Sequence, residues 1–268
     1  MSASTKNLTQ PTAPGVLARP GTHETVYSII ASQPRGKLLD VPAGEGALAA
    51  RFVASGFQVS CCDLYPEIFK LQDVEIRRGD LSGALPYGDA EFDYVTCVEG
   101  LEHIENPQQA IRGFARILKP GGHLVVTTPN ILNIEERVKW LLFGYTSHFK
   151  PLSREHIAAT SARAGGRDEV LLHVNPISYS ELRFSLEKAG FELRGAYRDR
   201  AKPRLWLYWP VTALIRALGA TVSHEKRRER WTDELNSSAV LRGGNTLIFH
   251  ATKVIGQNAA RKNAASNA

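Results

Sequence analysis

The chain has 268 residues, of which 43% are hydrophobic and 22% are charged. That length suffices for one large hydrophobic core with a modest lid, whereas two complete domains would be cramped. The formal net charge is +6, but acidic and basic residues are mixed along most of the chain, so charge alone identifies no partner.

The cysteines and the N-terminal residues favour an intracellular protein. Cys61 and Cys62 are neighbours and Cys97 falls in a predicted buried strand, which is unlike the spaced framework of a secreted disulfide protein. Residues 1–20 are polar and lack the apolar region of a secretory signal, so we expect a disordered leader. No apolar run approaches the roughly 18 to 20 residues that cross a bilayer. The sequence therefore predicts a cytoplasmic protein that at most rests on a membrane surface.

From residue 37 onward, short apolar runs alternate with helical patterns. The apolar runs include KLLDV, FQVSCCD, FDYVTCVEG and HLVVTTPN, and the helical segments include GALAARFVASG and PQQAIRGFARIL. In the helix expected over 107–118, Ala110, Phe114 and Ile117 share one face. Such alternation is typical of parallel sheets that are covered on both faces. We predict an α/β fold with a Rossmann-like, seven-stranded, mostly parallel sheet and helices on both faces.

The pattern loosens after Asn130, where a polar segment follows a helical stretch near 134–143. We interpret 131–177 as a cap that is inserted over the open end of the sheet. The whole domain is expected to span 21–255, with a disordered tail over 256–268. The elements that would complete the sheet are a helix over 180–189 and strands near 191–198 and 245–253.

A stripe of apolar residues lies within 204–235, a further segment that we expect to be helical. Pro210 suits the first turn of a helix, and three aromatic residues precede it. Such a stripe usually packs on a core, here on the sheet or over a substrate pocket. The alternative is that 205–218, together with the basic run EKRRER, makes a peripheral contact with an anionic membrane. The apolar positions at helical spacing are Val211, Leu214, Ile215 and Leu218.

The first predicted strand leads directly into a turn that contains glycine, LLDVPAGEG. Gly44 and Gly46 let the backbone approach a nucleotide closely, and Asp40 places an acid where an ammonium group could sit. Asp63 follows at the spacing of an acid that accepts hydrogen bonds from ribose hydroxyls. Both features also fit a nicotinamide dinucleotide, so an oxidoreductase stays an alternative. Asp80, at the end of the third strand, favours an adenosyl ligand instead because it offers a carboxylate to an adenine edge.

Four motifs follow one another in this part of the chain. They are LDVPAGEG, CCDLYP, RGDLSGALPYGDAEFDYVTCVEGLEHIENP and LKPGGHLVVTTPN. In this order they resemble the class I S-adenosylmethionine-dependent methyltransferases, in particular the bacterial ubiquinone-biosynthesis-like and glycan-cluster group. The resemblance covers 37–130 closely and implies S-adenosylmethionine as the cofactor. Position 42 departs from it, since Pro42 stands where the family usually has Gly.

The resemblance also implies which residues surround the cofactor. Each of them has a purely structural explanation as well, since the glycines could serve only a tight turn and Asp80 could cap a turn ahead of Ser82. A shared ligand explains the set better, because all of its members follow the carboxyl ends of successive predicted strands. The implied residues are Asp40, Ala43, Gly44 and Gly46 at the methionine part, Asp63 and Leu64 at the ribose, Asp80 and Leu81 at the adenine, and Glu99 beside the sulfonium.

Few catalytic side chains are needed, because a sulfonium methyl group is already electrophilic and the protein mainly holds a nucleophile in line with it. A hydroxyl acceptor would also need a base, for which histidine is the commonest choice at neutral pH. We rank His148 first as this base and His103 next, with His156 and His173 as further candidates. The cluster of Glu99, Glu102 and His103 could suggest a metal, but a Glu and a His that are adjacent on a loop do not match the spacing of a zinc-binding helix, so no metal is expected.

The turn after the fourth predicted strand indicates which class of molecule accepts the methyl group. Methyltransferases that act on amino groups of nucleic-acid bases usually carry Asn/Asp-Pro-Pro-aromatic there, whereas this chain has VEGLE. The segment TPNILNIEERVKWLLFG resembles methyltransferases of bacterial surface-polysaccharide clusters. We therefore expect O-methylation of a sugar, a lipid-linked molecule or a small metabolite, and we expect no nucleic-acid partner. The alternatives are an RNA methyltransferase, a nicotinamide-dependent oxidoreductase, and a cofactor-binding subunit without turnover.

Overall fold

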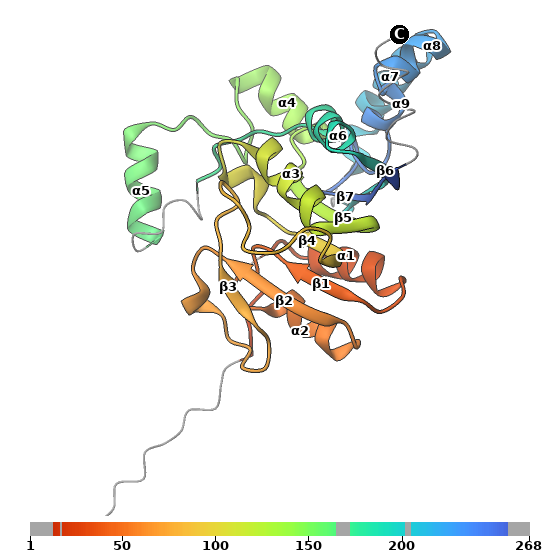
Figure 1. Cartoon of the computed structure of the whole chain (residues 1–268). Helices are drawn as coiled ribbons and strands as arrows, with labels where there is room; N and C mark the ends of the chain where they lie inside the picture. The colour runs from red at the N-terminus through yellow and green to blue at the C-terminus, as the bar shows by residue number, and fades with distance from the viewer. Residues whose placement is uncertain (1–12, 17, 165–171, 202–204, 257–268) are drawn as a thin grey trace, which may run out of the picture.

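The computed structural model describes residues 13–16, 18–164, 172–201 and 205–256. At its centre is a seven-stranded sheet in the order β3-β2-β1-β4-β5-β7-β6 (Figure 1). β7 pairs antiparallel with β5 and β6, and the other neighbouring strands pair parallel, which confirms the predicted Rossmann-like sheet. The strands are β1 (Lys37–Asp40), β2 (Gln58–Asp63), β3 (Ile76–Arg78), β4 (Phe92–Cys97), β5 (Leu118–Pro129), β6 (Phe191–Arg198) and β7 (Thr246–Lys253).

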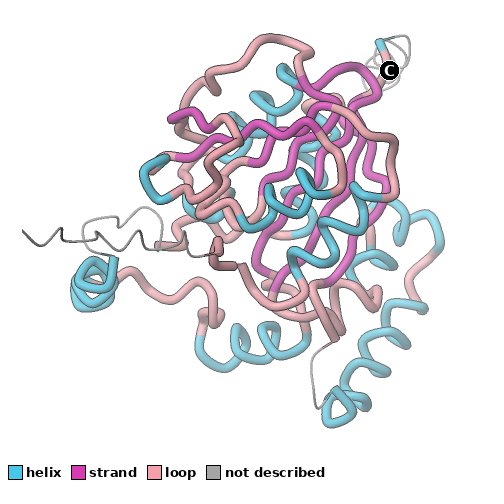
Figure 2. The backbone as a smooth tube through the Cα atoms, turned by 90° about the horizontal axis from the view of Figure 1, so that it is seen from below, coloured by secondary structure: helices cyan, strands magenta, loops and turns pink. Residues whose placement is uncertain are grey.

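Helices lie on both sides of this single layer of strands (Figure 2). α3 (Pro107–Ile117) and α6 (Tyr179–Lys188) cover one face, where Phe114 and Leu182 are fully buried against the strands. α3 ends one residue earlier than predicted, because the backbone of Leu118 is already extended and starts β5 without a loop.

The opposite face is covered by α1 (Thr22–Ala31) and α2 (Ala47–Ala54), which contact each other as well as the sheet. Val26, Ile30 and Phe52 bury their side chains against strand residues of that face. Neighbouring residues of one strand therefore serve two different cores, as expected when a parallel sheet is covered on both sides. The strand residues of this second core are Leu38, Val59, Tyr94, Val125 and Ile248.

The segment 131–177, predicted to be a cap, contains α4 (Ile134–Phe143) and α5 (Arg154–Ala164). Figure 1 shows α5 standing away from the sheet. α4 is held at its start by the side chain of Asn133, which accepts a hydrogen bond from the Glu136 backbone N–H. The buried Glu136 carboxylate in turn accepts the backbone N–H of Ser147 at 2.6 Å, which folds the chain back after α4.

Residues 205–235 form four short helices: η4 (Leu205–Tyr208), α7 (Trp209–Ala220), α8 (His224–Glu229) and α9 (Thr232–Leu235). The prediction that the apolar stripe of α7 packs on a core is wrong, because Val211, Leu214 and Leu218 are exposed. The helix is attached by its polar side instead, where the Arg216 guanidinium donates hydrogen bonds to the Asn236 carbonyl and the Ser238 hydroxyl. No helix in the described part of the chain is both long and apolar enough to span a membrane.

The remaining short helices are η1 (Pro66–Ile68), which follows β2, and η2 (Leu101–His103), which follows β4. Both come directly after a strand that ends at the carboxyl edge of the sheet. That edge is where open α/β sheets bind their ligands, so the loops after β1, β2, β3 and β4 are the places to look for a site.

Candidate cofactor and acceptor site

The turn between β1 and α2 bends sharply around its glycines. Gly44 and Gly46 have positive φ angles of 53° and 94°, and the Gly46 N–H donates a hydrogen bond to the Ala43 carbonyl at 2.9 Å. A Cβ at Gly46 would lie 2.7 Å from a ring carbon of Phe69, so a larger residue would not fit without a shift. The Val41–Pro42 peptide bond within this turn is cis.

Asp63 joins the tip of β2 to the glycine turn. Its buried carboxylate accepts the backbone N–H of Gly44 at 2.8 Å through one oxygen and that of Tyr65 at 2.9 Å through the other. An ionised carboxylate can accept about four hydrogen bonds in all, so acceptor capacity remains for the hydroxyls of a ligand. The two loops predicted to share one ligand are thus held together by a predicted site residue.

Asp40 lies at the end of β1, in register with Thr96 of β4, and is 2% exposed. The Thr96 hydroxyl donates a hydrogen bond to its carboxylate at 2.8 Å. Burial raises the pKa of Asp40 to about 7, and the neighbouring Asp63 carboxylate acts in the same direction. A buried acid with a raised pKa gains when a cationic group comes close, because the cation stabilises its charged form.

The loop after β3 is less enclosed. Asp80 is exposed, and its carboxylate accepts a hydrogen bond from the Ser82 N–H at 2.7 Å. It therefore caps the turn ahead of Ser82, which is the structural role that the sequence allowed for it. Leu81 is half-buried, and a Cβ added at Gly100 would lie 3.0 Å from its side chain. The carbonyl of Leu64 accepts a hydrogen bond from the Arg78 guanidinium.

A cavity of about 400 Å³ lies beside the ends of β4, β5 and β7. Glu99 and His148, both predicted site residues, are on its wall, together with Glu102 and His173. Glu99 has a positive φ of 49°, and its N–H donates to the Thr127 hydroxyl at 2.9 Å. Burial raises the pKa of the Glu99 carboxyl. The cavity therefore brings together residues of η2, of the loop before η2, and of the inserted segment.

The described part of the N-terminal segment contacts both ends of this site. The Gly15 N–H donates to the Glu45 carboxylate at 2.6 Å beside the glycine turn, and the Arg19 N–H donates to Glu99 at 3.2 Å. Ala18, Arg19 and Pro20 also line the cavity. The leader predicted over 1–20 thus includes residues that help to form the site, and its polar composition gave no signal of these contacts.

The four candidate histidines are not equivalent. The ring of His148 stacks parallel to that of His173, with the ring centres 6.3 Å apart. His103 has its Nδ1 at 3.0 Å from the Leu172 carbonyl, and burial lowers its pKa. His156 is on α5, which Figure 1 places away from the sheet. Of the two histidines ranked for the base, His148 is the one on the cavity wall.

Curated relatives match only part of the chain. Over 103 residues it is 37% identical to the ubiquinone biosynthesis O-methyltransferase of Xanthomonas oryzae pv. oryzae, which covers 35% of this chain and 43% of that protein. The protein of the same name from Xanthomonas campestris pv. campestris is 36% identical over 106 residues, covering 36% of this chain and 44% of the relative. The chain thus spans less than half the length of these relatives.

Solved structures match over most of the chain. A putative methyltransferase from Bacillus halodurans is 21% identical, with a TM-score of 0.54. The match covers 87% of this chain and 99% of the Bacillus protein. A methyltransferase from Archaeoglobus fulgidus is 16% identical, with a TM-score of 0.53, and covers 87% and 95%. These likenesses concern the fold. A family described as a methyltransferase domain matches residues 23–195, more than half of the sequence, and this chain belongs to that family.

Proposed function

We propose that this protein transfers a methyl group from S-adenosylmethionine to a hydroxyl of a sugar, a lipid-linked molecule or a small metabolite. The observation that carries the proposal is the cavity beside Glu99, next to strand ends that hold two buried acids and a glycine turn. Membership in a methyltransferase family favours this activity over a nicotinamide-dependent oxidoreductase. The O-methyltransferase relatives, though they match about a third of the chain, favour oxygen as the accepting atom.

The residues of the turn fit S-adenosylmethionine chemically. Asp40 is a buried acid whose raised pKa would fall beside the ammonium group of the methionine part. Asp63 keeps acceptor capacity for ribose hydroxyls, and Gly44 and Gly46 leave the backbone uncovered where the ligand would pass. Asp80 with Leu81 would face the adenine, with Leu64 beside the ribose and Glu99 beside the sulfonium.

Bound S-adenosylmethionine would supply a methyl group that is already strongly electrophilic. The residues of this chain then have two tasks, which are to hold the acceptor hydroxyl in line and to take up its proton. We assign the proton to His148, because it lies on the cavity wall beside a neutral neighbour, His173, whose pKa burial lowers to about 4. His103 is the second candidate, although its Nδ1 faces the Leu172 carbonyl.

Labelled S-adenosylmethionine, incubated with the protein and fractionated cell extract, tests the acceptor class. We expect label in the glycan, lipid or small-molecule fraction, whereas label in the RNA fraction would favour the RNA methyltransferase alternative. Absence of label from every fraction, with the cofactor still bound, would indicate a subunit without turnover.

His148→Ala tests the assigned base. Loss of a general base should lower kcat by about 100-fold or more while leaving cofactor affinity unchanged. His156→Ala, on α5, is the matched control. Equal turnover of the two variants would remove His148 from the mechanism.

The exposed face of α7 supports a peripheral membrane contact through 205–218. Trp209, Leu214 and Leu218 are each more than half exposed, and α8 carries three consecutive basic residues. An amphipathic helix with basic neighbours is attracted to anionic lipid, where lipid-linked acceptors are found.

Co-sedimentation with vesicles that contain phosphatidylglycerol, at low salt, tests this contact. Leu214→Asp should weaken binding several-fold, because a charge replaces an apolar side chain on the contacting face. Val53→Asp changes an exposed apolar residue of α2 and serves as the control. If the wild-type chain stays in the supernatant, the membrane contact is excluded.

A further inference from the structure

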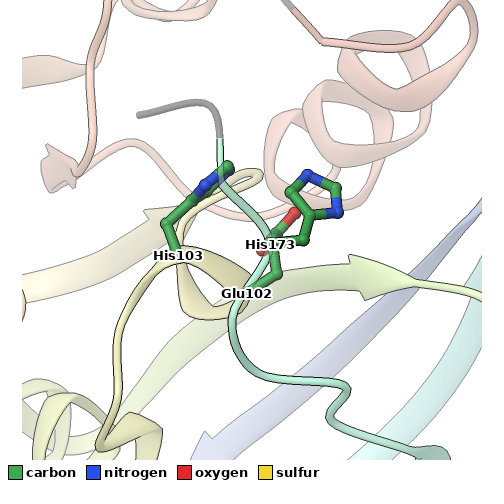
Figure 3. Close-up of side chains that lie close together, drawn as sticks. All are labelled: Glu102, His103 and His173. Carbon is green, nitrogen blue, oxygen red and sulfur yellow. The ribbon is translucent and has the colours of Figure 1, made fainter. Parts of the chain in front are cut away.

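A cluster of three side chains has the composition of a metal site, and two of them, Glu102 and His173, are on the cavity wall. Glu102 and His103 come from η2, and His173 comes from the end of the inserted segment, far along the chain (Figure 3). One ligand atom of each residue lies within 4.8 Å of the others. Small side-chain rotations would bring three such atoms to about 2 Å from a common ion.

The backbone holds the two segments of this cluster against each other. The carbonyl of Glu102 accepts hydrogen bonds from the N–H groups of Val174 at 2.9 Å and Asn175 at 3.1 Å. The ring of His103 packs edge-on against that of His173, with the centres 4.8 Å apart. The juxtaposition therefore rests on main-chain hydrogen bonds between the two segments and does not depend on the side chains alone.

Two of the three residues have buried polar atoms that lack a partner. Within the described part of the chain, Oε2 of Glu102 and Nδ1 of His173 are buried and accept or donate no hydrogen bond. Glu102 is 1% exposed. Leaving a buried polar group without a hydrogen bond is unfavourable, and more so for a charged group, so such a pair on one wall indicates a missing ligand.

The third residue is oriented as a metal-binding histidine usually is. Nδ1 of His103 lies 3.0 Å from the Leu172 carbonyl oxygen, so Nε2 is the ring nitrogen that would bind an ion. Metal-bound histidines commonly donate their other ring N–H to a carbonyl in this way, which fixes the ring and its tautomer. The ring of His148 also lies parallel to that of His173, with the ring centres 6.3 Å apart.

We propose that Glu102, His103 and His173 bind one divalent transition-metal ion, zinc by preference, and that the cavity supplies the open coordination position. Two imidazoles and one carboxylate are a common ligand set of zinc sites that keep a position for water or substrate. Imidazole ligands favour zinc and its neighbours over magnesium or calcium. This differs from the sequence-based expectation of no metal, because the third ligand could not be placed from the sequence.

The protonation of the three groups agrees with this proposal. Burial raises the pKa of Glu102 to about 8 and lowers that of His173 to about 4, with His103 and His148 adding to the latter effect. The imidazoles are therefore neutral and ready to bind near pH 7, while a cation would convert Glu102 to its ionised form. On the basis of the proposed function, the open position would then hold the acceptor hydroxyl and lower its pKa.

Metal uptake is measured on the full chain without cofactor or acceptor, so that the result is independent of methyl transfer. The protein is treated with a chelator, dialysed, and titrated with zinc sulfate, and bound zinc is counted by elemental analysis after desalting. We expect one equivalent. Cobalt(II) in place of zinc should give the strong visible absorption of a tetrahedral or five-coordinate site with nitrogen ligands.

His173→Ala and Glu102→Gln should each weaken zinc binding by roughly tenfold or more, since even outer-shell changes cost that much. His224→Ala, an exposed histidine on α8, is the matched control and should bind as the wild type does. Circular dichroism of each variant verifies the fold. The proposal is overturned if the wild type retains no zinc after desalting, or if His173→Ala retains as much as His224→Ala.

Discussion

Helices α3 and α7 carry similar apolar stripes in the sequence and meet opposite surroundings in the structure. In α3, Phe114 and Ile117 are fully buried between the sheet and its covering helices, whereas in α7 Leu214 and Leu218 face outward. Helical periodicity is a property of neighbouring residues and predicts both helices well. What the apolar face meets depends on distant segments, which periodicity does not encode.

The site has two halves, the cofactor half around the glycine turn and the cavity half beside Glu99. They differ in the same way, since one is built from local contacts and the other from distant segments. Asp40, Gly44 and Asp63 are arranged by contacts between β1, β2 and the turn that joins β1 to α2, all close in the sequence. The cavity wall instead combines residues from the N-terminal segment, from η2 and from the inserted segment, Arg19 and His173 among them. Local motifs define the first half, and tertiary contacts define the second.

The largest expected difference between α3 and α7 is in how much each apolar face contributes to the free energy of unfolding. Phe114→Ala should lower the free energy of unfolding by about 3–5 kcal/mol, because it removes a fully buried ring and leaves a cavity. Leu214→Ala should change it by less than about 0.5 kcal/mol, since that side chain is exposed. Urea unfolding followed by circular dichroism measures both. A large loss in Leu214→Ala would mean that the face of α7 is covered in solution, for example by a second copy of the chain.

Within the cofactor half, Asp63→Ala should have the next largest effect. Its carboxylate accepts hydrogen bonds from both Gly44 and Tyr65, so the variant loosens the glycine turn. It would also lose the proposed hydrogen bonds from the ribose hydroxyls, and each hydrogen bond to a charged group contributes about 1.5–3 kcal/mol. Affinity for S-adenosylmethionine should therefore fall by about 100-fold in a calorimetric titration. Asp73→Ala, an exposed acid in the loop before β3, should leave affinity unchanged. If both variants bind alike, the acid at the tip of β2 does not contact the cofactor.

Much of the fold could be predicted from the sequence, because its elements are periodic and short loops connect them. The bounds of β6 and of α4 agree with the predicted 191–198 and 134–143. α6 begins one residue earlier than predicted, since Ser178 and Glu181 form a capping box at its start. The structural role of Asp80 as a turn cap could also be foreseen, because Asp favours this position ahead of a Ser.

The cavity could be predicted only in part, for a physical reason. Glu99 and Glu102 follow β4, so their place at the carboxyl edge comes from the sheet topology. Arg19 reaches the same cavity through a backbone hydrogen bond to Glu99, which any residue other than proline can make and which leaves no trace in the sequence. Thr246 is there because β7 runs antiparallel and starts at that edge.

A smaller effect is expected from Asp40, the second buried acid of the cofactor half, because its pKa should make cofactor affinity depend on pH. Asp40 has a pKa of about 7, so the ionised carboxylate that would pair with an ammonium group is a minor form at pH 6. Affinity for S-adenosylmethionine should rise about five- to tenfold from pH 6.0 to pH 7.5, since the binding-competent fraction rises by that factor. Asp40→Asn should bind more weakly at both pH values and show a flat profile. A steep profile in this variant would assign the pH dependence to another group.

A pH effect on stability is expected at the β5–β7 joint, where these two strands pair antiparallel. His123 of β5 and His250 of β7 stack, with ring nitrogens 2.9 Å apart, and Arg194 of β6 lies close enough to affect both. Burial lowers the pKa of His250 to about 4, with His123 and Arg194 adding to it. Because the folded pKa lies below the unfolded value, the stability contributed by His250 is present above pH 6.5 and is lost as pH falls toward 4.

His250→Gln removes the contribution of His250 and its coupling to His123, while Asp40 and the other groups away from this joint respond to pH alike in both proteins. Between pH 7.5 and pH 5.0 the wild type should lose about 1–2 kcal/mol more unfolding free energy than the variant does. Urea unfolding at the two pH values gives the difference. Asp40 acts with the opposite sign, because its raised pKa makes folding more favourable as pH falls, so the total change alone would hide the histidine. Parallel losses in both proteins would mean that the β5–β7 joint tolerates a charged His250, and that solvent reaches it more than its burial suggests.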